Sequence, residues 1–371
     1  MAHPDVLIVG GGVIGAACAY NLALRNVSVS VIEAGPRPGA ATPAAGGMLA
    51  PFAESAAEDP LLSLCVRARD VYNDLSVVLQ EETGIDIGLR TEGILQVAFT
   101  EEEAAGLKSD IAWQRQSGFA TEWLSAEDVR ELVPGLGPEA LGGAHAPEDG
   151  GLVPMALREA LLEGARKRGM TLVEGQSVER LVVSDGQVTG VETGTGPLPA
   201  GAVVVAAGCW SGGLEGLPRP LPVEPIRGQM AALDWPAGEP AAIIYGGGGG
   251  TYVLERGGEA IAGSTMEQAG FATGVTEDGL RQVYRSVRRI YPALTELPVK
   301  RTWAGLRPGT PDNRPILGRD PEVENLWYAT GHGRNGILLA GMTGDFLAQL
   351  YAGDELEHDL SSMDPGRFAA S

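Results

Sequence analysis

One arginine, Arg334, stands among glycines in the segment GHGRNGILLAG, residues 331–341. The apolar run that follows predicts a helix beginning near Gly336, whose N-terminal N–H groups would favour negative charge beside the loop. Gly331, Gly333 and Gly336 would let the backbone approach a ligand closely. In a chain of formal net charge −21, an arginine placed in this way predicts contact with an anion. The alternative is a glycine-rich helix start with Arg334 in water.

A second glycine-rich segment predicts a dinucleotide site. Gly10, Gly12 and Gly15 form G-x-G-x-x-G directly after a predicted strand, residues 5–9, and at the start of a predicted helix. The first glycine permits a tight turn, the second lets a pyrophosphate approach, and the third lets helix and strand pack closely. Glu33 ends the next predicted strand about 20 residues on, where a carboxylate can bind an adenosine ribose and disfavours the 2′-phosphate of NADP. A turn that only packs is the alternative, and FAD and NAD share this fingerprint.

The elements that must position these residues alternate between two patterns. Strand, helix and strand at the N-terminus form a βαβ unit, and residues 154–168, 171–174 and 203–208 continue it as helix, strand and buried strand. Residues 178–183 and 187–192 predict a hairpin around Asp185-Gly186. The intervening segments carry alternating strand-like pieces, which suit a mixed antiparallel sheet. The five glycines of residues 246–250 predict a hairpin tip, because no helix follows them.

The predicted fold class is therefore α/β, with a Rossmann-like nucleotide-binding domain built from discontinuous segments and a mixed antiparallel-sheet substrate domain. We expect the nucleotide-binding domain to comprise residues 1–84, 150–220 and 299–371. The substrate-binding domain would comprise residues 85–149 and 221–298. Ligands commonly bind at such a junction between domains.

Composition excludes several classes of protein. No segment approaches the roughly 18 uncharged apolar residues of a membrane span, and the N-terminus has no basic region of the kind that begins a secretion signal, so we expect a cytoplasmic protein without a membrane partner. The net charge of −21 argues against a nucleic-acid partner. Cys18, Cys65 and Cys209 form no CxxC pair, so buried thiols are expected and no metal site is predicted.

Several motifs together resemble a known family. They are VLIVGGGVIGAACAYNLA with Glu33, AGGMLAP (residues 45–51), VVVAAGCWS, WAGLRPGTPDNRPILG (residues 303–318) and GHGRNGILLA. The chain is similar, from Val6 to about Leu350, to the FAD-dependent amine oxidases of the D-amino acid oxidase superfamily, and most of all to the glycine oxidases of the bacterial thiamine pathway. The resemblance implies non-covalent FAD, because no cysteine follows Cys209 to carry a covalent flavin.

The resemblance also implies residues on the substrate side. A substrate carboxylate in an apolar cleft needs a buried partner, and a bidentate arginine is the natural one. Arg307 takes this role, Tyr252 shapes the pocket or donates to the carboxylate, Met48 and Met266 line the cleft, and Arg334 adds positive charge near flavin and substrate. Without the resemblance, Arg307 would be assigned to an ordinary ion pair, Tyr252 to a half-buried strand position, and the methionines to core packing.

The expected flavin contacts extend the glycine fingerprint. His332 is given no proton-transfer role, and Val178 would contact adenine through its backbone. The full set of expected cofactor-binding residues is Gly10, Gly12, Val13, Ile14, Gly15, Glu33, Thr42, Gly46, Gly47, Met48, Val178, Gly208, His332, Gly333, Arg334, Asn335, Gly336, Ile337 and Leu338.

Two positions depart from the family pattern. Gly250-Thr251-Tyr252 stands where the family has HxY, and Gly333 stands where it usually has an aromatic residue. Both changes enlarge or loosen the site, so they bear on the restriction to glycine more than on the type of reaction.

The implied function is FAD-dependent oxidative deamination of glycine and other small amines, such as sarcosine and small D-amino acids. The products would be an imine, then glyoxylate or a keto acid, ammonia and H2O2, and dehydroglycine would supply the thiazole of thiamine. The implied partners are the amine, O2, a thiazole synthase and further copies of the chain in a tetramer. The alternatives are a D-amino acid oxidase or dehydrogenase of broader range that uses another electron acceptor, and a non-catalytic or NAD-dependent nucleotide-binding protein.

Overall fold

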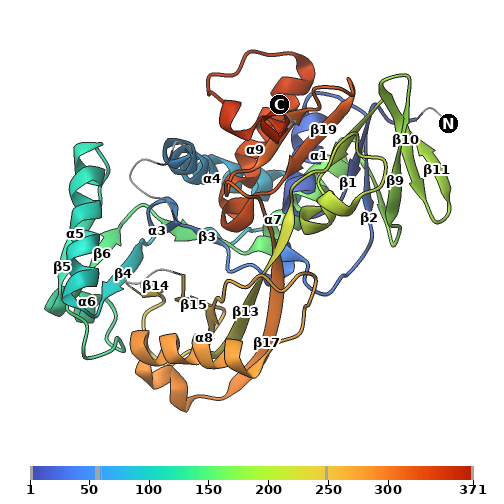
Figure 1. Ribbon diagram of the computed structural model, residues 1–371. Helices are drawn as coiled ribbons and strands as arrows, with labels where there is room; N and C mark the ends of the chain where they lie inside the picture. The colour runs from blue at the N-terminus through green and yellow to red at the C-terminus, as the bar shows by residue number, and fades with distance from the viewer. Residues whose placement is uncertain (1–2, 55–58, 60, 247–249, 369–371) are drawn as a thin grey trace.

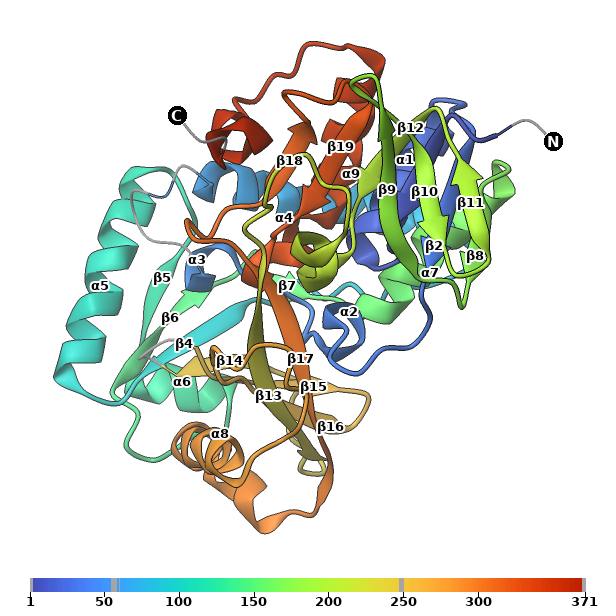
Figure 2. The ribbon, with the colours of Figure 1, turned by 45° about the vertical axis from the view of Figure 1, so that its right-hand side comes forward.

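The computed structural model describes residues 3–54, 59, 61–246 and 250–368, and its two large sheets divide the molecule into two parts (Figures 1 and 2). One is a six-stranded sheet in the order β18-β19-β12-β1-β2-β8, parallel except for the edge strand β18. Its strands are β1 (Val6–Val9), β2 (Val29–Glu33), β8 (Thr171–Glu174), β12 (Ala202–Val205), β18 (Ile316–Arg319) and β19 (Leu326–Thr330).

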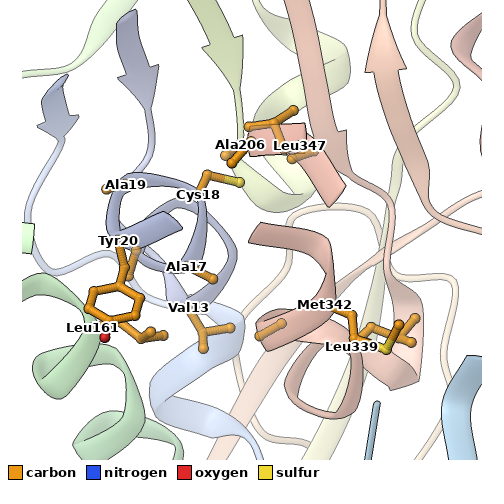
Figure 3. Close-up of a cluster of buried hydrophobic side chains, with 14 of the residues drawn as sticks. Val13, Ala17, Cys18, Ala19, Tyr20, Leu161, Ala206, Leu339, Met342 and Leu347 are labelled. Carbon is orange, nitrogen blue, oxygen red and sulfur yellow. The ribbon is translucent and has the colours of Figure 1, made fainter. Parts of the chain in front are cut away.

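Helices cover one face of this sheet. They are α1 (Val13–Leu24), α4 (Leu62–Thr83), α7 (Pro154–Lys167) and α9 (Gly336–Ala352). Helix α1 packs between α7 and α9, which explains why it is apolar on nearly all sides. Figure 3 shows Tyr20 of α1 beside Leu161 of α7, with Met342 of α9 on the opposite side of α1.

A small antiparallel sheet covers the other face. It consists of β9 (Val178–Ser184), β10 (Gln187–Thr193) and β11 (Gly196–Pro199). Asp185 and Gly186 both have positive φ, as a tight hairpin turn requires, so the predicted hairpin is confirmed. Because both faces of the six-stranded sheet are covered, consecutive residues of β1 are all buried, Val6 and Ile8 in one core and Leu7 and Val9 in the other.

The second part is an eight-stranded sheet in the order β17-β13-β16-β15-β14-β4-β6-β5. Helix α8 (Glu277–Ile290) packs on one face, and the other face turns toward the six-stranded part. Its strands are β4 (Ile94–Ala98), β5 (Glu122–Ser125), β6 (Gly142–Ala146), β13 (Glu224–Asp234), β14 (Ile243–Gly246), β15 (Tyr252–Arg256), β16 (Glu259–Gly263) and β17 (Val299–Gly309). The predicted α/β class with a Rossmann-like part and a mixed-sheet part is thus confirmed.

The remaining elements lie between the two large sheets or around them. The two-stranded pair β3 (Met48–Leu49) and β7 (Gly150–Gly151) lies between the sheets, and α5 (Glu101–Gln116) and α6 (Ala126–Leu132) lie at the far edge of the large sheet. The others are α2 (Ala41–Ala44), α3 (Pro51–Glu54), η1 (Gly208–Gly213), η2 (Pro292–Glu296), η3 (Gly333–Asn335), η4 (Ser361–Met363) and η5 (Pro365–Phe368).

One expected boundary differs from the strand pairing. The sequence pattern predicts that residue 299 returns the chain to the nucleotide-binding domain, but β17 pairs along its whole length with β13 in the large sheet. The alternating pattern of residues 299–309 predicts a strand but does not say which strand it pairs with. Here the partner is β13, which lies earlier in the chain than α8 and η2. The return to the six-stranded part therefore follows Gly309.

Three further sequence predictions concern the glycine run, membrane-spanning helices and the cysteines. The glycine run of residues 246–250 joins β14 to β15, and its residues 247–249 lie outside the described part of the chain. None of the helices that the structure describes combines the length and the apolar composition needed to cross a membrane. Cys18, Cys65 and Cys209 are all buried, as expected.

Candidate active site

A cavity of about 1090 Å³ lies where the two parts meet. Its wall includes the β1–α1 turn, the end of β2, residues 34–48, η1, and the loop that leads into α9. From the large sheet it receives residues of β13, β15 and β17. Two segments that the sequence singled out separately, the G-x-G-x-x-G turn and the GHGRNG loop, are therefore brought to one cavity.

The glycine turn has the close approaches that its pattern predicts. Gly10 has φ +106°, and a Cβ on it would lie 2.5 Å from the carbonyl oxygen of Ala206. A Cβ on Gly15 would lie 1.9 Å from the carbonyl oxygen of Gly10, so α1 can pack against β1 only with glycine there. Gly12 is the N-cap of α1 and lines the cavity, and as a glycine it has no side chain of its own to cap the helix. The N-terminus of α1 thus opens into the cavity, where it can bind an anion.

Glu33 and Thr42 complete this turn. One carboxylate oxygen of Glu33 accepts a hydrogen bond from the Gly11 N–H at 2.6 Å, and the other accepts from the Gly35 N–H at 3.1 Å. The Thr42 hydroxyl accepts from the Val13 N–H at 3.1 Å. Both side chains line the cavity, as do Ile14, Val178 and Gly208. Gly15 does not line it and acts through packing.

Two arginines of this wall, Arg158 and Arg37, were not predicted from the sequence. Arg158, on α7, donates from Nε to the carbonyl oxygen of Gly11 at 2.6 Å. Arg37 donates to the Ser177 hydroxyl at 2.6 Å and lies over the Trp210 ring, with its guanidinium carbon 5.4 Å from the centroid. Both line the cavity and add positive charge to it. Neither belongs to a sequence motif. Arg158 lies on α7 and Arg37 in the loop after β2, and the packing of these elements places both side chains at the cavity.

The GHGRNG loop forms the opposite wall. Helix α9 begins at Gly336, as predicted, and no side chain caps it. Gly331 and Gly333 have φ of +74° and +54°, and a Cβ on Gly331 would lie 2.6 Å from the Thr310 methyl carbon. Arg334 is exposed and lines the cavity, so it stands at the rim. Asn335, Gly336, Ile337 and Leu338 line the cavity as well.

His332 is buried in the same loop, with 3% of its surface exposed. Its Nε2 lies 3.0 Å from the Thr343 hydroxyl of α9, while Nδ1 has no hydrogen-bond partner among the described residues. Burial lowers the pKa of His332 to about 3, so the imidazole is neutral near pH 7. A neutral ring held by α9 fits a structural and cofactor-facing position.

Arg307 reaches the cavity from β17. Its Nη2 donates to the Ser264 hydroxyl, and its Nη1 donates to the carbonyl oxygen of Thr265 at 3.3 Å. A Cβ on Gly228 would lie 2.2 Å from Nη1, so a larger residue at that position of β13 would displace the guanidinium from its present direction. Ser264, which is 6% exposed and also lines the cavity, was not predicted. These contacts fix the direction of the guanidinium before any ligand arrives.

Tyr252 lies near Arg307 in the same cavity wall and is 4% exposed. Its hydroxyl lies 3.7 Å from the Met230 sulfur. A Cβ on Gly46 would lie 2.4 Å from the Tyr252 hydroxyl oxygen and 2.8 Å from the Met48 sulfur. Gly46, Met48, Met230 and Tyr252 therefore form one compact wall, of which the sequence missed only Met230.

Met266 differs from its expected position. It does not line the cavity, and 52% of its surface is exposed. Its neighbours explain this, because Thr265 and Glu267 both turn inward to bind Gln229. In an extended segment the residue between two inward side chains points outward. Gly47, by contrast, lines the cavity as expected.

The residues present fit an FAD molecule. The cavity is at the upper end of ordinary ligand pockets, about 300–1,000 Å³, as a dinucleotide and a small substrate together require. Two helix N-termini, α1 and α9, open into it, and the close approaches at Gly10, Gly15 and Gly46 have no room for side chains. Glu33, Thr42 and Arg158 would hold the nucleotide end, and the GHGRNG loop the ring end. Among the described residues, no group of His, Cys, Asp and Glu side chains could hold a metal ion.

Comparisons with known proteins agree with this geometry. Residues 5–350 match the family model described as DAO, FAD dependent oxidoreductase. The chain is 36% identical to the bifunctional protein ThiO/ThiG of Trichormus variabilis over 369 residues, which cover 98% of this chain and 55% of that protein. It is 35% identical to a glycine oxidase of Geobacillus kaustophilus, covering 96% of this chain and 95% of the relative.

Structural similarity extends over the whole chain. A crystal structure of glycine oxidase from Geobacillus kaustophilus matches with a TM-score of 0.92 at 32% identity and covers 100% of both chains. The chain thus spans about half the length of the bifunctional relatives and nearly the whole of the glycine oxidases.

Proposed function

The chain belongs to the DAO family of FAD-dependent oxidoreductases, and on this premise we propose that it oxidises glycine and other small amines, with O2 as the electron acceptor. Its relatives named glycine oxidase support the choice of substrate class. The observation that carries the proposal is the Arg307 guanidinium, held by Ser264 and Thr265 beside the compact wall of Tyr252 and Gly46.

The reaction balances as a two-electron oxidation. The amine loses a hydride from Cα and a proton from nitrogen to give an imine, water hydrolyses the imine to glyoxylate or a keto acid and ammonia, and O2 is reduced to H2O2. The chemistry that bound FAD supplies is acceptance of the two electrons and their transfer to O2.

The protein's own side chains bind and orient the substrate. Arg307 would bind the substrate carboxylate through two charge-assisted hydrogen bonds, and the Tyr252 hydroxyl would face the same group. Met48 and Met230 exclude water from the pocket, which strengthens these electrostatic contacts. Arg334 at the rim and the N-terminus of α9 would stabilise negative charge at the ring end of the cofactor.

The pocket wall bears on which amines are accepted. Gly46 leaves almost no space beside Tyr252, and this favours small substrates. Gly333 lines the cavity, and no described atom lies within 4 Å of a Cβ added to it, so the missing side chain leaves open space there. Gly250 does not line the cavity. Sarcosine and small D-amino acids are therefore included in the proposal with glycine.

The proposal also covers the use of the reaction product, the oligomeric state and the location of the protein. Release of dehydroglycine to a thiazole synthase, for the thiazole of thiamine, is supported by the relatives named ThiO/ThiG. A tetramer and a cytoplasmic location complete the proposal.

A single anaerobic experiment tests the proposed activity. Glycine, sarcosine and D-alanine are mixed in turn with the FAD-loaded protein, and glycine is expected to bleach the visible flavin absorbance. Admission of air should restore the absorbance and give one H2O2 and one glyoxylate for each glycine consumed. A flavin that no amine reduces would refute the proposal, and a reduced flavin that persists in air would favour the dehydrogenase.

A further inference from the structure

One half-buried arginine, Arg256, binds the loop that forms the substrate wall. It is the last residue of β15, and its Nη2 donates to the carbonyl oxygens of Gly46 and Leu152, the latter at 3.0 Å. No carboxylate of the described residues forms an ion pair with it. Among the described residues, the two backbone carbonyls are therefore the hydrogen-bond partners of this guanidinium.

Arg256 and Tyr252 act on the same short segment. They lie four residues apart on β15 and therefore on the same face of the strand. Tyr252 contacts Gly46 closely from one side, while Arg256 holds the carbonyl of the same residue. The segment is also held at Ala44, whose carbonyl accepts a hydrogen bond from the Trp303 indole at 3.1 Å. The large sheet thus fixes residues 44–47, which belong to the nucleotide-binding part.

The second carbonyl that Arg256 binds, that of Leu152, belongs to a segment that also contacts residues 46–47. Leu152 follows β7, and its N–H donates to the carbonyl oxygen of Gly47 at 2.9 Å. Arg256 therefore joins two neighbouring backbone segments that already bind each other. If the guanidinium were removed, Gly46 could move away from Tyr252, because no other side chain among the described residues holds its carbonyl.

We propose that Arg256 is a positioning residue that fixes Gly46 against Tyr252 and so sets the width of the amine pocket, an inference that rests on the proposed function. The residue does not line the cavity and acts only through the loop. Substrate affinity and the preference for glycine over larger amines are therefore the properties that it controls.

The test compares Arg256→Met and Arg256→Lys with a matched control. Arg130 also donates to backbone carbonyls, those of Ala126, Pro138 and Ala140, but at α6, outside the cavity wall. Glycolate, the hydroxy analogue of glycine, serves as the binding probe through its effect on the flavin spectrum of the FAD-loaded protein. Hydrogen exchange of residues 44–48 reports the position of the loop without any catalysis.

In Arg256→Met, we expect residues 44–48 to exchange at least tenfold faster and the glycolate Kd to rise by about 10- to 100-fold. The ratio of kcat/KM for D-alanine to that for glycine should rise at least threefold. Arg256→Lys should be intermediate, because the lysine side chain keeps the positive charge but is one bond shorter, so its ammonium reaches the two carbonyls less closely than Nη2 does. Arg130→Met should leave all three quantities within twofold of wild type.

Unchanged exchange at residues 44–48, or faster exchange with an unchanged glycolate Kd, would overturn the inference. If Arg256→Met does not fold, Arg256→Lys decides, with a threefold shift in exchange and Kd expected and no shift refuting it. A wild-type protein that neither binds glycolate nor is reduced by an amine would refute the proposed function instead, and hydrogen exchange would still show whether Arg256 holds the loop.

Discussion

Replacement of Arg307 by methionine removes the guanidinium and keeps an unbranched side chain that is two bonds shorter. In the wild-type protein the guanidinium is already oriented by Ser264 and Thr265, so little freedom is lost when a carboxylate binds. We expect Arg307→Met to lose most of the affinity for glycine and glycolate while the protein still folds and binds FAD.

The size of the effect follows from the hydrogen bonds that the substitution removes. Two charge-assisted hydrogen bonds of about 1.5–3 kcal/mol each disappear, and deletion of one partner of a buried ion pair costs about 3–5 kcal/mol. A decrease of about 4 kcal/mol in binding free energy corresponds to about a 1,000-fold fall in kcat/KM. Arg307→Lys keeps the charge but not the fork, so a fall of about 10- to 100-fold is expected.

The assay is the glycolate Kd from flavin absorbance, together with kcat/KM for glycine from H2O2 formation. Lys300→Met is the control, because Lys300 lies on the same strand and pairs with Asp234 at 2.7 Å, where both side chains are at least 40% exposed. An exposed pair of this kind contributes about 0–1 kcal/mol to stability and nothing to the cavity. Wild-type glycolate affinity in Arg307→Met would refute the assignment of Arg307 to the carboxylate.

Three further predictions concern the cofactor side of the cavity. Gly15→Ala should abolish FAD binding and give a colourless protein, because the new Cβ would lie 1.9 Å from the Gly10 carbonyl oxygen, whereas Gly106→Ala, with open space around it, should stay yellow. Glu33→Gln should raise the FAD Kd at least tenfold, measured by flavin fluorescence, because the Gly11 N–H loses a charged acceptor at 2.6 Å; an unchanged Kd would contradict the role of Glu33. His332→Gln should make folding less sensitive to acid. The pKa of His332 is about 3 in the folded protein and about 6.5 when unfolded, so stability present above pH 6.5 is lost as the pH falls. Urea unfolding should show a loss between about pH 7 and pH 5 that is about 2 kcal/mol smaller in His332→Gln, and equal losses would refute the neutral imidazole.

Local sequence patterns correctly predicted turns and helix starts, which depend on only a few neighbouring residues. The start of α9 at Gly336, the hairpin at Asp185-Gly186 and the turn at Gly10 are set by glycine geometry and by neighbouring side chains, both of which are visible in the sequence. The family motifs also singled out Arg307 and Tyr252, and the structure places both in the wall of the cavity that the glycine turn lines.

Long-range contacts were not predictable in the same way. Arg158 and Ser264 reach the cavity only because distant elements pack together, and a lone arginine on a helix or serine in a loop carries no such information. Met266 was misplaced because its direction depends on Gln229, which binds the residues on either side of it. The boundary at residue 299 failed for the related reason that alternation does not identify a strand's partner.

The order of strands in the six-stranded sheet also governs when the protein can acquire its cofactor during synthesis. Strand β19 pairs with β12, and the loop after β19 supplies one wall of the cavity, so both are missing until the ribosome has passed residue 338. The nascent chain can assemble β13 with β16 and β17 earlier, since all three precede residue 310. The complete flavin cavity therefore exists only once the chain has been made through residue 338.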